Sequence, residues 1–299
     1  MHEHDHSKLN YNRAFMLGVV LNVVYIMLEV GTGLYVNSLA LLSDATHNLS
    51  DVVGLLLAWG AHALSGVGPS DRRTYGWRGS SILAALANGL ILLLVTGGIA
   101  WEAIQRFGAD NAVTGTVVIV VAAIGVVING VTAMLFYKGC QHDLNVRGAF
   151  LHMAADAAVS LGVVVSGIVI AAWNWQWVDP TVSLLIAAVI FWGTWGLFRE
   201  SLDLALHAVP KGIDINRVRT LLENLPGVVV VHDLHVWAMS TTETALTAHL
   251  VKPAIEDEDL FLFNATHELH EHFGIEHVTL QIERNAETSI CQHADPHAI

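Results

Sequence analysis

Two histidine–aspartate pairs interrupt long apolar segments of the chain. His47 and Asp51 lie in one segment and His152 and Asp156 in another, each with the spacing His-x-x-x-Asp. In an α-helix this i, i+4 spacing places imidazole and carboxylate on one face. Two such faces turned toward each other supply two nitrogens and two carboxylate oxygens, a tetrahedral set that Zn²⁺ accepts readily and that also admits Cd²⁺ or Co²⁺. The spacing therefore predicts one metal site shared by two helices.

A second interpretation is that each pair is a hydrogen bond joining two helices. An isolated ionisable residue in a membrane span costs about 2.5–3.5 kcal/mol on insertion scales and marks a functional site by default. Two identical pairs therefore favour the metal site. Asp44, three residues before His47, either joins that site or lines the approach to it. Glu29 either ties helices together by hydrogen bonds, as buried polar residues of membrane helices commonly do, or lines the pathway.

The composition places these pairs in a membrane protein. Of the 299 residues, 54% are hydrophobic and 14% are charged, whereas a soluble domain carries about 25% charged residues. A net charge of −13 argues against a nucleic-acid partner. Two cysteines are too few for a disulfide scaffold. The chain is therefore expected to be an integral membrane protein.

Six apolar stretches are long enough to cross a bilayer as helices. They are Arg13–Val36, Leu39–Leu64, Ser81–Ile104, Val113–Tyr137, Gly148–Ala172 and Thr181–Leu197. Most Lys and Arg residues fall in alternate loops, and the opposite loops contain only Arg106. The positive-inside rule then predicts that both termini are cytoplasmic. We expect a transmembrane domain over residues 13–208 in a bacterial inner (plasma) membrane, preceded by a His-containing cytoplasmic tail over residues 1–12.

After Pro210 the pattern becomes that of a small soluble domain. Helical and strand-like segments follow in the order αββαβ, which predicts a two-layer α+β domain over residues 209–285 and a flexible tail over 286–299. His232, His235, His249 and Glu283 lie on the predicted strands. If the first two strands form a hairpin, His235 and His249 reach one ion and Glu283 supplies an oxygen. The alternative is that they are ordinary edge and surface residues.

Several sequence motifs together resemble the cation diffusion facilitator family, and specifically its zinc-type members similar to bacterial zinc/cadmium/cobalt resistance exporters. The motifs, in chain order, are Ser38-Leu-Ala-Leu-Leu-Ser-Asp-Ala-Thr-His-Asn-Leu-Ser-Asp51, Arg73-Thr-Tyr-Gly-Trp-Arg78, His152-Met-Ala-Ala-Asp156, Trp177-Val-Asp-Pro180 and Val231-His-Asp-Leu-His-Val-Trp237. The resemblance implies a homodimer of six-helix protomers, a metallochaperone-like cytoplasmic domain and exchange of divalent metal for protons.

The resemblance also implies residue roles. The transport site would be His47, Asp51, His152 and Asp156, the same four that the spacing indicates. The histidines and the glutamate on the predicted strands would form a regulatory metal site near the dimer interface. Zn²⁺ is then substrate and regulatory ligand, with no resident cofactor. Two further ligand sources remain open, namely the His2/His4/His6 run and Cys291.

Two other function classes compete with alternating-access transport. An intramembrane zinc hydrolase needs a general base and an open coordination position, as in His-Glu-x-x-His, and none of the six apolar stretches contains that motif. A membrane-anchored metal sensor would signal through the cytoplasmic domain. An anchor has no need of two ligand pairs in its spans, so the sequence favours a secondary active transporter, not an enzyme.

Overall fold

The computed structural model describes residues 22–107, 112–137, 144–253 and 257–284. It separates into two compact units, Met1–Leu56 with Ala87–Leu197, and Leu57–Leu86 with Phe198–Ile299. The boundary between these units falls inside three long helices, so the division of the chain at residues 13, 209 and 286 stays a prediction. The two predicted tails lie outside the described residues.

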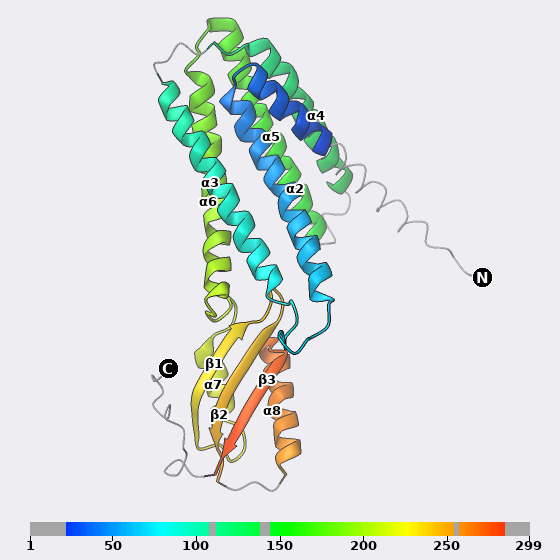
Figure 1. Ribbon diagram of the computed structural model, residues 1–299, viewed down its shortest axis with the longest axis vertical. Helices are drawn as coiled ribbons and strands as arrows, with labels where there is room; N and C mark the ends of the chain where they lie inside the picture. Colours follow the sequence, from blue (N-terminus) through cyan, green and yellow to red (C-terminus); the bar gives the residue numbers. More distant parts are fainter. Residues whose placement is uncertain (1–21, 108–111, 138–143, 254–256, 285–299) are drawn as a thin grey trace, which may run out of the picture. The chain divides into compact units, whose positions relative to one another are not determined.

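Long helices build the membrane domain (Figure 1). After a helical segment over residues 22–35, which continues the first predicted span, come α2 (Leu39–Ser65), α3 (Ser80–Arg106), α4 (Gly115–Tyr137), α5 (Leu144–Trp173) and α6 (Val178–Ala205). Among the described residues, α3, α4, α5 and α6 are each long and apolar enough to cross a membrane. Polar residues, including His47 and Asp51, interrupt α2 and lower its mean hydropathy. The predicted fold class, a helical transmembrane domain followed by a small α+β domain, is confirmed.

A buried carboxylate at the start of α6 holds the start of α2. Asp179 accepts hydrogen bonds from the Ser38 hydroxyl at 2.5 Å and from the backbone N–H groups of Leu39 and Ala40 at 2.8 and 3.4 Å. The first N–H groups of a helix have no partner within the helix, so an acidic side chain satisfies them and complements the helix dipole. This cap fixes the register of the helix that carries His47 and Asp51.

Two glycines let α4 and α5 approach closely. A Cβ atom at Gly115 would lie 2.6 Å from the carbonyl oxygen of Gly167, and a Cβ at Gly167 would lie 3.0 Å from that of Gly115. Small residues at such crossings bring helix backbones together in membranes, where packing replaces the hydrophobic effect. The crossing positions α5, the second ligand-bearing helix.

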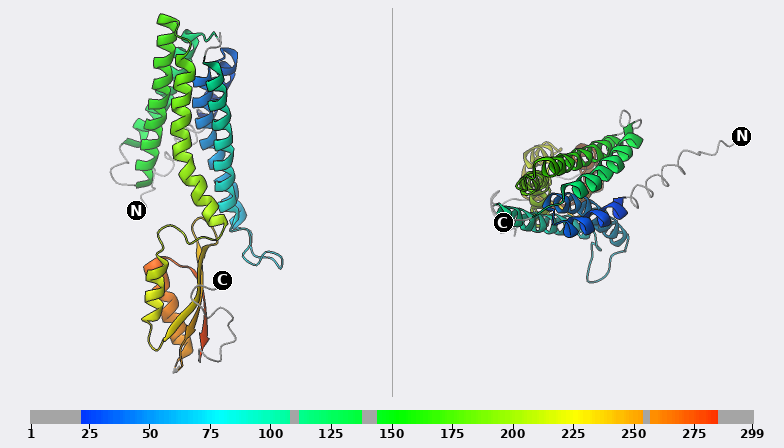
Figure 2. Two further views of the ribbon diagram at one scale, coloured as in Figure 1. Left: turned by 90° about the vertical axis from the view of Figure 1, so that its left-hand side faces the viewer. Right: turned by 90° about the horizontal axis from the view of Figure 1, so that it is seen from above.

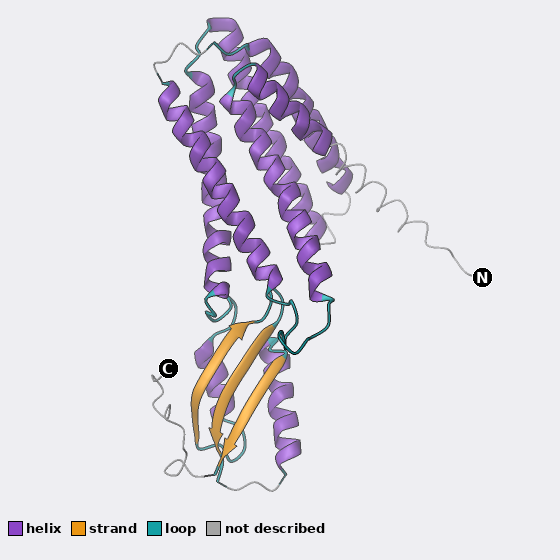
Figure 3. Cartoon of the chain, viewed as in Figure 1, coloured by secondary structure: helices purple, strands orange, loops and turns teal. Residues whose placement is uncertain are grey.

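The C-terminal part of the second unit has the predicted αββαβ order (Figure 3). Its elements are α7 (Ile215–Glu223), β1 (Val230–Ala238), β2 (Thr244–Val251), α8 (Glu258–Phe273) and β3 (His277–Glu283). Asp214 and Asp257 cap the two helices by accepting from the N–H groups of Asn216 and Leu260. β1 and β2 pair antiparallel, and β3 joins β2 in parallel because α8 carries the chain back.

The sheet has one apolar and one polar face. α7 and α8 lie together against one face (Figure 2, left). The core beneath them contains Val231, Val236, Leu246, Leu250 and Leu269. Because side chains alternate along a strand, the residues between these strand positions point to the opposite face, which neither helix covers. That face carries the strand residues that the sequence singles out as ligands.

Candidate functional site

The two His-x-x-x-Asp pairs meet in the first compact unit. His47 Nε2 on α2 lies 3.3 Å from Asp156 Oδ1 on α5, and His152 Nε2 on α5 lies 3.2 Å from Asp51 Oδ2 on α2. Within α5, His152 Nε2 is 3.7 Å from Asp156 Oδ2. Each histidine thus lies nearer to the aspartate of the other helix. One ligand atom each from His47, Asp51 and Asp156 falls within 4.8 Å of the others.

These separations fit a metal ion. With metal–ligand bonds of about 2.1 Å, a tetrahedron has edges of about 3.4 Å. The His47–Asp156 and His152–Asp51 separations of 3.3 and 3.2 Å are close to two such edges. Asp156 Oδ1 is buried, and His47 Nε2 lies 3.3 Å from it. Either separation alone also suits a hydrogen bond between helices, and it is the crossed arrangement of two such pairs that favours a metal ion.

The site is buried on one side and accessible on the other. Asp156 is 1% exposed and His47 is 24% exposed, whereas the side chains of Asp51 and His152 are 35% and 42% exposed. Asp51 lies one helical turn after His47 along α2, and His152 lies one turn before Asp156 along α5. Of the two more accessible ligands, Asp51 therefore lies toward the C-terminal end of α2, and His152 lies toward the N-terminal end of α5.

A second ligand cluster lies on the polar face of the sheet. His232 on β1 lies opposite His249 on β2, and Glu283 lies at the end of β3. The two Glu283 oxygens lie 3.1 Å from His232 Nε2 and 3.1 Å from His249 Nδ1. Ligand atoms of these three residues fall within 4.8 Å of one another. The cluster offers two imidazoles and a carboxylate, a set that suits Zn²⁺.

The structure places His235 differently from the hairpin geometry expected above. The β1–β2 register shifts between His232 and His235, so that His235 lies opposite Thr247 and His232 opposite His249. In the shift, Asp233 adopts φ 50°, a left-handed conformation that Asp tolerates better than most residues. Its carboxylate lies 2.9 Å from His235 Nε2 and 3.4 Å from His249 Nε2. Asp233, which the sequence pattern does not single out, therefore joins His232, His249 and Glu283 as a fourth side chain of this cluster that could bind a metal.

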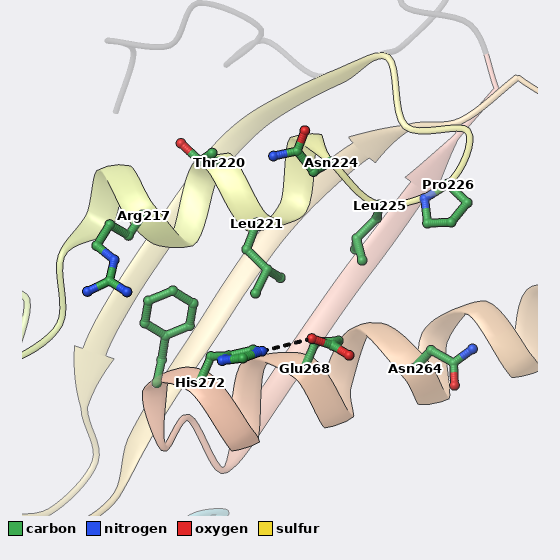
Figure 4. Close-up of a pocket in the computed structure, with 10 residues that line it drawn as sticks. Arg217, Thr220, Leu221, Asn224, Leu225, Pro226, Asn264, Glu268 and His272 are labelled. Atoms are coloured by element: carbon green, nitrogen blue, oxygen red, sulfur yellow. Dashed lines mark ion pairs between the residues drawn. The ribbon is translucent and has the colours of Figure 1, made fainter.

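The helical side of this domain has a groove but, among the described residues, no comparable ligand cluster. Between α7 and α8 the groove has a volume of about 660 Å³ and is lined by residues that include Arg217, Leu221 and Asn264 (Figure 4). His272 lies there 3.1 Å from Glu268, one turn earlier on α8. This pair is exposed, as expected for an ordinary solvated helix face. The His2/His4/His6 run and Cys291 lie outside the described residues.

Comparison with known proteins identifies the family of the chain. A family model described as the cation efflux transmembrane domain matches residues 15–204, and one described as the cation efflux protein cytoplasmic domain matches residues 210–285. The chain belongs to the cation efflux family, also called the cation diffusion facilitator family. It is therefore a multi-pass membrane protein of a transporter family, as the resemblance predicts.

Individual members of the cation efflux family match over almost their full length. The "Cadmium, cobalt and zinc/H(+)-K(+) antiporter" of Bacillus subtilis is 33% identical over 95% of this chain and 92% of its own. "Zinc transporter ZitB" of Escherichia coli is 33% identical over 94% and 91%. A solved structure, the metal-bound C-terminal domain of the CzcD transporter from Cuprividus metallidurans, is 32% identical and covers 24% of this chain and 99% of its own. Its TM-score of 0.23 is too low to carry a structural conclusion.

Proposed function

We propose that this chain exports Zn²⁺ in exchange for protons, with Cd²⁺ and Co²⁺ as further substrates. The observation that carries the proposal is the crossed arrangement of ligands, in which His47 faces Asp156 and His152 faces Asp51 at 3.3 and 3.2 Å. His47, Asp51 and Asp156 supply one nitrogen and two oxygens within 4.8 Å of one another, and His152, 3.2 Å from Asp51, would supply the second nitrogen of a set that binds an ion reversibly. The printed names of the Bacillus and Escherichia relatives support the same class of substrate.

Proton coupling follows from the chemistry of the ligands. An imidazole binds a metal only when neutral and a carboxylate only when ionised, so protons and metal compete for the same atoms. Histidine changes its charge near neutral pH, so a modest change of environment between two states switches the occupant. In alternating access, the metal enters from the cytoplasm and displaces protons. Exposure to the outer side then releases the metal and restores the protons.

The uneven accessibility of the site supports a cytoplasm-facing conformation. We propose that both termini are cytoplasmic, in a bacterial inner membrane, as the distribution of Lys and Arg predicts. In that orientation the C-terminal end of α2 and the N-terminal end of α5 face the cytoplasm. Asp51 and His152, the more exposed ligands, lie at those ends of the site. Asp156, which lies toward the outer side, is buried.

We further propose that the cytoplasmic domain binds regulatory Zn²⁺ and that two copies of the chain form a homodimer. His232, His249 and Glu283 are the central ligands because their ligand atoms gather within 4.8 Å. His235 would contribute through Asp233, whose carboxylate lies between His235 and His249. Metal bound on this face would tighten the domain and bias the transporter.

The transport proposal is tested by metal flux into proteoliposomes, with and without an imposed pH gradient. We expect Zn²⁺ uptake that depends on the gradient in the wild type and is lost in Asp156→Asn. The matched control is Glu102→Gln, which neutralises an exposed carboxylate paired with Arg106 on α3. Flux that ignores the gradient but vanishes in Asp156→Asn indicates a channel. Absence of flux from folded wild type contradicts transport and favours the membrane-anchored metal sensor.

The cytoplasmic site is tested on the full chain in detergent. In an Asp156→Asn background, which removes the transport site, calorimetry should detect a remaining Zn²⁺ site that His249→Gln abolishes. His272→Gln, on the exposed face of α8, is the control and should leave this binding unchanged. Equal binding by the His249 variant and the control would contradict the assignment.

A further inference from the structure

A pair of buried acidic residues lies beyond the metal site in the first unit. Glu29, in the helical segment 22–35, and Asp44, on α2, are both fully buried. The Tyr25 hydroxyl donates to Glu29 Oε1 at 2.9 Å, and the Ser160 hydroxyl donates to Asp44 Oδ2 at 2.7 Å. The other oxygens, Glu29 Oε2 and Asp44 Oδ1, are also buried, and neither has a well-formed hydrogen bond within the part of the chain that the structure describes. Among the described residues, neither carboxylate forms an ion pair with Lys or Arg.

The two carboxyl groups belong to one cluster. The carboxyl groups of Glu29 and Asp44 interact with each other, and the buried side chain of Asn48 on α2 interacts with Glu29. The hydroxyls that hold them also converge, because a side chain at Gly125 on α4 would overlap the Tyr25 hydroxyl and lie 3.1 Å from Ser160 Oγ. Glycine at this position therefore leaves room for the hydroxyls between three helices.

A buried amide next to this cluster also lacks partners. Asn129 is fully buried, and neither its side-chain oxygen nor its side-chain nitrogen has a hydrogen-bond partner. It lies one helical turn after Gly125, so it shares the face of α4 that Gly125 presents to Tyr25 and Ser160. Buried polar groups in native proteins are nearly always paired, so this amide has donor and acceptor capacity available for a ligand.

Two adjacent carboxylates cannot both stay charged in an apolar bundle unless a cation joins them. The donors here are oxygens from carboxylates, hydroxyls and an amide. Such ligands suit hard cations, whereas the nitrogen-containing site one turn away suits Zn²⁺. The remaining ionisable groups that face the pair are Tyr25, His47 on α2 and Asp156 on α5. α4 contributes no Asp, Glu, His, Lys or Arg.

We propose that Glu29 and Asp44, with Asn129, bind a monovalent counter-cation that crosses the membrane opposite to the metal, in addition to the protons that are exchanged at the metal ligands themselves. That cation is either a proton shared by the carboxyl groups or an alkali ion. Asp44 precedes His47 on α2 by three residues, and Ser160 follows Asp156 on α5 by four, so the cluster lies one turn from the metal site on the same two helices. The direction is opposite to that of the exposed ligands, toward the proposed outer side. A cation arriving there repels the metal and favours its release.

The inference rests on the exchange activity proposed above, and its test separates the two. Proteoliposomes containing the full chain are assayed in two modes, with Glu29→Gln compared with the wild type and with Glu102→Gln. In the first mode, a proton gradient at equal K⁺, or a K⁺ gradient at equal pH, drives Zn²⁺ uptake. In the second mode, radioactive Zn²⁺ exchanges for unlabelled Zn²⁺ with no ion gradient, and no counter-cation needs to move.

We expect gradient-driven Zn²⁺ uptake by Glu29→Gln to be about tenfold slower than that of the wild type, a typical size for coupling between two sites. Zn²⁺–Zn²⁺ exchange should change little. Whichever gradient drives the wild type identifies the cation. Gradient-driven uptake equal to wild type would overturn the inference but leave the exchange activity standing. Loss of both modes in a protein that elutes as folded would also overturn it, because the pair would then serve metal passage itself. Wild type without Zn²⁺ uptake under either gradient would instead refute the proposed function.

A milder variant tests the same cluster with less risk of misfolding. Tyr25→Phe removes the hydroxyl that holds Glu29 but keeps both carboxylates and most of the packing. It should bind the counter-cation more weakly, so that half-maximal stimulation of Zn²⁺ uptake requires a higher cation concentration while the maximal rate is retained. An unchanged concentration dependence would contradict the role of this cluster.

Discussion

Replacing Asp156 with asparagine should weaken metal binding more than any other single isosteric change in the membrane domain. Asp156 is buried and contacts both histidines, with separations of 3.3 Å to His47 and 3.7 Å to His152. Asparagine keeps the shape of the side chain but removes the charge that balances the ion. The expected loss is therefore one ligand and its charge, without a cavity.

The magnitude follows from the number of ligands. Four-ligand zinc sites bind with about 10–16 kcal/mol, or about 2.5–4 kcal/mol for each ligand. That range corresponds to a loss of about 10²- to 10³-fold in affinity. Because Asp156 faces both imidazoles, we expect the upper part of this range. Asp51→Asn should lose less, because Asp51 is partly exposed and water compensates for its charge.

The assay is competition between a fluorescent zinc chelator and the full chain in detergent. Both variants are measured in a His249→Gln background, so that the cytoplasmic cluster does not bind the titrated metal. Glu102→Gln controls for loss of one negative charge. Loss of one ligand should lower the Zn²⁺ affinity far more than threefold. A Zn²⁺ affinity of Asp156→Asn within about threefold of the parent protein would therefore refute the assignment of Asp156 to a four-ligand site.

Three further outcomes are expected. Zn²⁺ affinity should fall as the pH is lowered through the range in which the two imidazoles gain protons, by up to about a hundredfold per pH unit, because both imidazoles must be neutral to bind. A dissociation constant that does not change with pH would exclude histidine ligands. Asp179→Ala should lower stability by about 1–3 kcal/mol, because it leaves buried donors at the start of α2 unsatisfied, and thermal unfolding in detergent should show a lower midpoint than wild type. Gly125→Ala should lower the free energy of unfolding by about 1–3 kcal/mol because its methyl group would overlap the Tyr25 hydroxyl. The control is Gly130→Ala on the same helix, where the methyl group meets open space and should be neutral or stabilising. Equal unfolding midpoints for the two variants would contradict this packing.

Helical and strand periodicity made much of the fold predictable from the sequence. The αββαβ order appears as predicted, with His277–Glu283 as the last strand. The His-x-x-x-Asp spacing likewise placed each pair of ligands on one helix face, because 3.6 residues per turn is a local property of the backbone. The glutamate at position 29 was recognised as unusual by its charge alone, since an acid in an apolar span is costly.

Contacts between distant segments were decided only by the tertiary structure. Helix periodicity fixes which residues share a face, but the register of α2 against α5 depends on the Asp179 cap and on the glycine crossing with α4. That register sets His47 against Asp156, whereas Asp44 meets Glu29 through the packing of segment 22–35 against α2. On the sheet, one shift in strand register places His232 at the centre of the cluster and adds Asp233, while His235 moves to its edge. A single added residue in a strand reverses which side chains face the cluster, and local sequence preferences do not specify where that shift occurs.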